Sequence, residues 1–353
     1  MVTTHIAGLR RNSNVNENDE LRIREVIENE ISNGSGASLG YRSIWHVLRL
    51  QYHIHVPRQV VAQVLQEIDP EGVQQRRRRR LSRRRYTSFG PNFCWHVDGY
   101  DKLKPYGFPI HGAIDGYSRK ILWLEVVRSN NKPEVPARFY LDCVKNIEGC
   151  PLVVRSDCGT ENGVLAAMQC YFRKDGNDLF AGHNAHKYGT SSANQRIEGW
   201  WSYFRRARTG WWMDFFKDMV SSGQLEIGNT LQMECLWFCF SPVLSCELEA
   251  VKMQWNTHRI RPTRNYGTVA GIPDVLYYLP GNFGAAECKR AVANERIHEM
   301  EQHAIGDEEF DTLEIYKEYF NYVLDKEDLN LPANAADAFE LYLKLIEFAS
   351  SEN

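Results

Sequence analysis

The sequence comprises 353 residues, of which 43% are hydrophobic, enough for two or three domains with at least one buried core. It holds no apolar run of the roughly 18 residues that a membrane-spanning helix needs. Residues 1–20 lack the apolar stretch of a secretory signal, so we expect an intracellular protein. Nine scattered cysteines without a CxxC pair argue against a structural zinc site and favour reduced cysteines in the core.

The net charge of −3 conceals an uneven distribution along the chain. Residues 301–353 hold fourteen acidic residues and three lysines, which leaves 39 basic and 31 acidic residues in the first 300. Residues 76–85 hold eight arginines. A block of this charge stays solvated and attracts polyanions. We therefore expect nucleic acid as the partner, and a merely solvated linker is the alternative. The same block is compatible with nuclear import, and the residues expected to bind DNA are Arg76, Arg77, Arg78, Arg79 and Arg80.

Residues 19–72 carry three patterns typical of short helices, after a polar tail at 1–18 that we expect to be disordered. Pro57 suits the first turn of the third helix, and Pro70 is expected to end it. Three short helices with tight connections predict a helix-turn-helix domain; a plain three-helix packing domain is the alternative. An arginine-rich linker is expected at 73–92, and the side chains available to a DNA groove are Arg58, Gln59, Gln63 and Gln66.

A mixed α/β sheet is predicted over residues 93–265. The stretch "FCWHVDGY" alternates in polarity, as a strand does, and "FPIHGAIDGYSRKILWLEVV" predicts two strands joined by a tight turn. Helical patterns at 133–147 and at "GVLAAMQCYFR" flank the short apolar run "CPLVVRSD". A strand with loops follows, and then a helix begins after the serines of "SSANQRIEGWW".

Three acids stand out in this region. Asp98 lies on a mostly apolar strand, Asp157 follows a buried strand, and Glu198 lies on the polar side of an otherwise aromatic helix. A buried charge is costly unless it is paired or bound to a metal. Taken singly, each has another explanation: Asp98 as an ion-pair partner, Asp157 as a helix cap, and Glu198 as a solvent-facing acid.

Taken together, "WHVDGYDKL", "GAIDGYSRKILWLEV", "VRSDCGTEN" and "SSANQRIEGWW" resemble the catalytic core of retroviral-type integrases and DDE transposases. The resemblance extends over about residues 38–276. It implies a ribonuclease-H-like fold in which Asp98, Asp157 and Glu198 are catalytic and bind two Mg²⁺ or Mn²⁺ ions. The sequence departs from the retroviral pattern at Cys158, where asparagine is usual, and lacks the zinc-binding N-terminal domain. By resemblance Asp115 belongs to a structural turn, and Asp101 falls past the strand.

The residue types fit this chemistry. Hard divalent cations prefer carboxylate oxygens, and phosphodiester exchange suits two such ions. On the helix, Trp201 and Arg205 follow Glu198 at three and seven positions, hence on one face. We expect both to contact DNA together with Arg206 and Arg208, although the ring of Trp201 has core packing as its alternative.

The sequence thus predicts an integrase or transposase that cleaves and joins DNA strands. The alternatives are a host-adopted DNA-binding protein without catalysis and a plain metal-dependent nuclease. Because two strand ends must be joined, we expect a homo-oligomer, with "GWWMDFFKDM" (210–219) as its interface or, alternatively, as cover for the sheet. The C-terminal extension, 266–353, ends in an acidic helical tail. We expect a solvated accessory helix there rather than an autoinhibitory or partner-binding segment.

Overall fold

The computed structural model describes residues 17–32, 40–50, 52–78, 87–189, 194–262, 269–304 and 312–351. The chain divides into two compact units, Met1–Arg84 and Arg85–Asn353, and each is described by itself. Most of the polar tail expected at 1–18 lies outside the described residues, as do Arg79 and Arg80. No helix of the described ranges is long and apolar enough to cross a lipid bilayer.

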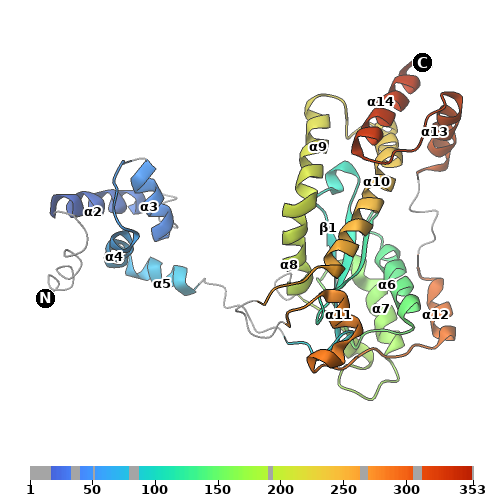
Figure 1. Cartoon of the computed structure of the whole chain (residues 1–353), viewed down its shortest axis with the longest axis horizontal. Coiled ribbons are helices and arrows are strands. Elements are labelled where there is room, and N and C mark those ends of the chain that lie inside the picture. The colour runs from blue at the N-terminus through green and yellow to red at the C-terminus, as the bar shows by residue number, and fades with distance from the viewer. Residues whose placement is uncertain are drawn as a thin grey trace. The chain divides into compact units, whose positions relative to one another are not determined.

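The first unit contains the three expected helices: α2 (Glu17–Ser32), α3 (Tyr41–Leu50) and α4 (Arg58–Ile68) (Figure 1). Apolar residues spaced three and four apart face one another and form its core, because this spacing puts them on one side of each helix. The buried members are Ile23, Ile27, Ile44, Leu48, Val61, Val64 and Leu65.

A fourth helix, α5 (Pro70–Arg78), follows at once, so the linker expected at 73–92 begins as helix. Pro70 ends α4 but also starts α5, since proline is tolerated at a first helical position. Asp69 stabilises this start by accepting a hydrogen bond from the backbone nitrogen of Gly72 over 2.8 Å. The arginine block therefore begins at the end of a helix.

The second unit is built on a five-stranded mixed sheet. Its strands are β1 (Cys94–Tyr100), β2 (Ile110–Asp115), β3 (Ile121–Val126), β4 (Val153–Ser156) and β5 (His186–Tyr188), in the order β3-β2-β1-β4-β5. The first three pair antiparallel, and β4 and β5 add parallel strands beside β1. This confirms the predicted mixed α/β sheet and is consistent with a ribonuclease-H-like core.

Helices cover both faces of the sheet (Figure 1). On one face α6 (Glu134–Ile147), α7 (Gly163–Phe172) and α12 (Asn294–Glu301) enclose a core with Trp95 and Val97 of β1. The other core contains Tyr100 with α8 (Gln195–Phe204), α9 (Gly210–Ser221) and α10 (Thr230–Thr257). Because side chains alternate along a strand, Asp98 belongs to the face that α8 covers. Smaller elements are the 3₁₀ turns Lys104–Tyr106, Thr160–Asn162, Gly182–Ala185 and Pro280–Phe283, the π-helix η6 (Arg205–Thr209) and α11 (Pro273–Tyr278).

The C-terminal helices α13 (Glu314–Lys326) and α14 (Ala335–Ser351) pack on α10, which corrects the expectation of a solvated tail. Phe320 of α13 and Tyr342 of α14 are fully buried. The reason is the sequence "CLWFCF" of α10, which is apolar on every side and needs cover beyond the sheet. The free energy gained by burying this apolar surface outweighs the tendency of the acidic tail to stay in solvent.

The aromatic stretch 210–219 covers the chain's own core, so the alternative interpretation of this stretch holds for most of it. Trp212 and Phe216 are buried, and Phe215 packs against Phe339 of α14 with ring centroids 5.9 Å apart. Trp211 differs, since it is 56% exposed and stacks on Phe215. Among the large apolar side chains of this stretch, Trp211 is therefore the one that is exposed to a second copy of the chain.

Candidate active site

Asp98 and Asp157 lie on neighbouring parallel strands at the same level. The pairing of β1 with β4 sets His96 opposite Arg155, and the same register continued by two residues sets Asp98 level with Asp157. Asp98 is 9% exposed, whereas Asp157 is half-buried just beyond the end of β4. The two strands thus bring together acids that are 58 intervening residues apart in the sequence.

Asp157 also stabilises the turn that follows it. Its Oδ1 accepts hydrogen bonds from the Gly159 backbone nitrogen over 3.3 Å and from Asn162 Nδ2 over 3.0 Å. This is a local side-chain-to-backbone turn, typical of aspartate. Asp157 is not the residue that caps α7, since that position belongs to Asn162. Asp157 therefore stabilises a turn instead of capping a helix. Its carboxylate remains partly open to solvent.

The start of α8, which carries Glu198, is fixed directly to β1. Asn194 precedes the helix and donates from Nδ2 to the carbonyl oxygen of Val97 over 2.9 Å. Its Oδ1 lies 2.7 Å from His96 Nδ1. Burial lowers the pKa of His96 to about 3, so the neutral ring donates this bond. Glu198, half-buried in the first turn of α8, is thereby held next to the strand of Asp98.

Trp201 lies over Asp98 and is buried, which corrects its expected place at the DNA. The indole is 5% exposed, and its Nε1 donates to Asp98 Oδ2 over 3.0 Å. Gly112 pairs with Asp98 in β2 and makes room for the ring: a Cβ there would lie 2.9 Å from Trp201 Cη2. The core-packing alternative for Trp201 therefore holds, and the residue orients an acid rather than stacking on a base.

The Glu198 and Asp157 carboxylates act electrostatically on Asp98. The pKa of Asp98 is raised to about 8, first by burial, then by the Glu198 and Asp157 carboxylates, while the Trp201 N–H acts in the opposite direction. As the side chains lie, however, the described residues include no group of three or more His, Cys, Asp or Glu set to hold a metal ion. The acids are electrostatic neighbours, but their carboxylates do not point to one common centre.

A model of the integrase core domain family matches residues 85–271, just over half of the chain. The chain belongs to this family. No curated protein matches it. Membership supports a polynucleotidyl-transferase type of function and DNA as the partner, as the resemblance predicted.

The integrase core carries exposed arginines directly after α8. The helix continues into η6, where Arg205, Arg206 and Arg208, the arginines that the sequence predicts to contact DNA, are exposed. A π-helix holds an extra residue per turn and so re-aims the side chains that follow it. A hollow of about 540 Å³ lies here, lined by Ser202, Arg205, Arg206, Gly210, Met213 and Asp214. Arg208 donates to Gln254 Oε1 over 2.8 Å.

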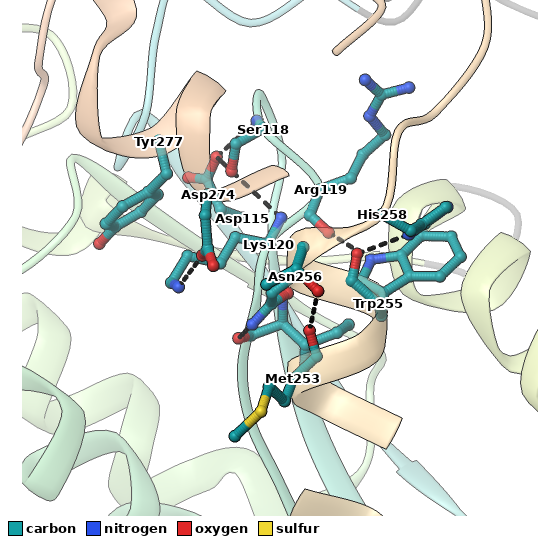
Figure 2. Close-up of polar contacts among 12 residues, drawn as sticks. Asp115, Ser118, Arg119, Lys120, Met253, Trp255, Asn256, His258, Asp274 and Tyr277 are labelled. Atoms are coloured by element: carbon teal, nitrogen blue, oxygen red, sulfur yellow. Dashed lines mark hydrogen bonds and ion pairs between the residues drawn. The ribbon is translucent and has the colours of Figure 1, made fainter. Parts of the chain in front are cut away.

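The other acids of the integrase core have structural partners. Asp115 is fully buried and accepts hydrogen bonds from the backbone nitrogens of Asn92 and Tyr117. It also accepts from the backbone nitrogen and the hydroxyl of Ser118, which Figure 2 shows beside it. It holds the β2–β3 turn together. Asp101 accepts from Lys104 and Asn130 beyond the end of β1. Neither carboxylate is among the charges that shift the pKa of Asp98.

The sequence did not predict which residues position Asp98 and Glu198. Asn194 and His96 fix the start of α8, and Gly112 makes room for Trp201. The two members of each contact lie far apart in the chain, so no local pattern predicts them. A signal was present for His96, which shares the polar side of β1 with Asp98. Of the predicted DNA-binding block, Arg76, Arg77 and Arg78 end α5, and Arg79 and Arg80 lie outside the described residues.

Proposed function

We propose that the protein is a metal-dependent DNA integrase or transposase that cleaves a DNA strand and joins its end to a second DNA. The observation that carries the proposal is that the Glu198 and Asp157 carboxylates act on the buried Asp98 carboxyl group within an integrase core. A protein that only binds DNA has no need for two carboxylates that oppose the ionisation of a third. Their ionised state becomes favourable when cations are bound.

The donor set fits Mg²⁺ or Mn²⁺. All three side chains offer carboxylate oxygens, the ligands that hard cations prefer. Burial raises the pKa of Asp98 first, and the Glu198 and Asp157 carboxylates raise it further. Asp98, Asp157 and Glu198 would hold two ions, after side-chain rotation of the two half-buried acids. Bound ions of this kind supply Lewis acidity to the attacking and the leaving oxygen of a phosphodiester.

The protein's own residues have separate roles in this proposal. Trp201 keeps Asp98 in one orientation through its N–H and covers one side of the carboxylate. The clamp of Asn194 on β1 keeps Glu198 at a fixed level along the strand. Arg205, Arg206 and Arg208 contact phosphates next to the reacting bond, since exposed guanidinium groups pair well with phosphate oxygens.

The first unit supplies DNA recognition in our proposal. Gln59, Gln63 and Gln66 are exposed on one side of α4, at spacings of four and three. Glutamine side chains offer both a donor and an acceptor to base edges in a major groove. The arginine block adds affinity that does not depend on sequence. We further propose a nuclear location and a homo-oligomer, because two ends must be joined to one target.

A catalytically idle DNA-binding protein is the second candidate, because the acids do not point to a common centre in the described structure. The deciding experiment is strand transfer. The full chain is incubated with a labelled duplex from the DNA that flanks its coding sequence, and with a plasmid target, in Mg²⁺ or Mn²⁺. Joined product that disappears with a chelator supports an integrase. Stable DNA binding without any cleaved or joined strand, in either metal, supports the idle binder.

A further inference from the structure

The face of α8 opposite Glu198 carries a different charge. Arg196 precedes Glu198 by two positions, which separates their side chains by about 200° around the helix. Arg196 instead shares a face with Trp200 and Tyr203, which follow it at four and seven positions. Both aromatic rings contact Trp255 of α10, with ring centroids 6.1 Å and 4.9 Å away. Arg196 thus lies on the side of α8 that adjoins the end of α10.

Trp255 joins this side of α8 to the β2–β3 turn. Its Nε1 donates to the carbonyl oxygen of Arg119 over 2.7 Å (Figure 2). Arg119 has a φ of 65°, a left-handed conformation that is uncommon for a residue with a side chain. Its own nitrogen donates to the Asp115 carbonyl oxygen over 2.9 Å. The turn therefore fixes where the Arg119 side chain leaves the backbone, and Figure 2 shows its guanidinium directed away from Asp115 and Ser118.

The guanidinium of Arg119 is affected electrostatically by Arg196. Burial, and then the positive charge of Arg196, lower the pKa of Arg119 to about 10. Arg119 is 7% exposed, and its Nη2 donates to the carbonyl oxygen of Val269. Its Nε is buried and has no hydrogen-bond partner within the described ranges. The positive charge of Arg196 thus acts on Arg119, and an anion bound near both would interact favourably with each of them.

Further basic or titratable residues follow along the chain at the end of α10. Ile260 and Gly271 exchange backbone hydrogen bonds of 2.9 and 3.2 Å, which fixes the strand-like course of the chain here. Arg259 and Arg261 flank Ile260 and are exposed, and in extended backbone two such neighbours project from the same side. His258 is also exposed, with Nδ1 2.6 Å from the Trp255 carbonyl oxygen. We name the set the α10-end surface; its members are Arg119, Arg196, His258, Arg259 and Arg261.

We propose that the α10-end surface binds the phosphate backbone of a DNA segment other than the one whose phosphate lies at Asp98, an inference that rests on the proposed function. Arginine is the residue that best matches phosphate oxygens, and contacts to the backbone carry no sequence preference. Because Glu198 and Arg196 point to opposite sides of α8, a straight duplex lying along the acids leaves the α10-end surface free for a second segment.

The test measures binding rather than catalysis. The full chain binds a fluorescent blunt duplex of mixed sequence at several NaCl concentrations, without divalent cations. The test variant carries Arg196→Gln, Arg259→Gln and Arg261→Gln. Arg119 is left intact because its bond to Val269 supports the backbone. The control variant loses the same charge on the opposite side of the sheet, through Arg138→Gln, Arg290→Gln and Arg296→Gln. Thermal unfolding of both variants verifies that they are folded.

We expect the slope of log K against log salt to fall by about 0.9 for each lost phosphate contact in the test variant, and to stay unchanged in the control. Equal slopes in the two variants would overturn the inference. Failure of the proposed function is a separate result: a wild-type protein without strand transfer can still show the difference in slope. If the wild-type protein carries out strand transfer but the test and control variants have equal slopes, the proposed function stands and only the role of the α10-end surface is wrong.

Discussion

Trp201 donates its indole N–H to Asp98 Oδ2 over 3.0 Å, in the space that Gly112 leaves open above the sheet. This contact connects the helix of Glu198 to the strand of Asp98, so the relative position of the two acids depends on one buried ring. Removing the donor leaves a buried carboxylate with fewer partners, which costs roughly 1–3 kcal/mol.

Trp201→Phe keeps an aromatic ring on the sheet but removes this donor. We expect weaker binding of Mn²⁺ and slower DNA cleavage, because Asp98 loses both orientation and a bond that favours its ionised form. Calorimetric titration with Mn²⁺ measures the first effect. Tyr203→Phe, on the half-exposed side of the same helix, is the matched control. Equal Mn²⁺ affinity in Trp201→Phe and wild type would show that the contact is packing alone.

The stability of the metal-free protein should depend on pH through Asp98. The pKa of this group is about 8 in the folded chain against an ordinary value of 3.8. Because the folded chain binds this proton more tightly than the unfolded chain, Asp98 contributes fully to stability below pH 3.8. This contribution is lost progressively as the pH rises toward 8. Asp98→Asn removes the titration. We expect it to raise the unfolding temperature more at pH 8.5 than at pH 5; a difference that is the same at both pH values would contradict the assignment.

The arginine block should supply binding that ignores DNA sequence. Changing Arg76 through Arg80 to glutamine should flatten the dependence of log K on log salt, by about 0.9 per lost contact on duplex DNA. Changing Gln59 and Gln63 to alanine should instead reduce discrimination between sequences and leave the salt dependence alone. An unchanged slope in the arginine variant would mean that the arginine block serves nuclear import and does not bind DNA.

The C-terminal helices should be needed for stability. Leu345 is 1% exposed in the core shared with α10, so Leu345→Ala should destabilise the second unit by about 2–5 kcal/mol. Leu343 of the same helix is 37% exposed, and Leu343→Ala should cost far less. Urea unfolding compares the two. Similar losses of stability would mean that α14 is not packed as described.

The fold was largely predictable because its signals are local. Alternation along "FCWHVDGY" and the tight turn at "DGYS" specify strands, and helical spacing specifies most helices. The packing of α14 was not predictable, since it depends on the apolar surface of α10, about a hundred residues away. The third helix predicted within residues 19–72 ends just before Pro70, as expected, yet the same proline begins α5, because proline is found both after the end of a helix and in its first turn.

The site was predictable only as a set of residue types. The order and surroundings of Asp98, Asp157 and Glu198 carried the resemblance, and the sheet register brings the first two level. Helical phase predicted that Trp201 shares a face with Glu198, but phase does not say whether that face meets solvent or the sheet. The answer depends on Gly112 in another strand, which the helix sequence does not contain.

The central claim is that Asp98, Asp157 and Glu198 act together in DNA cleavage. It is tested most directly by comparing Asp98→Asn, Asp157→Asn and Glu198→Gln with Asp101→Asn, a matched change on an exposed acid of the same unit. Cleavage of a labelled duplex is measured in Mg²⁺ and Mn²⁺, and DNA binding is measured alongside. We expect each of the first three variants to lose cleavage while still binding DNA, and Asp101→Asn to cleave like wild type. Undiminished cleavage by Asp157→Asn, or by either of the other two, would contradict the account.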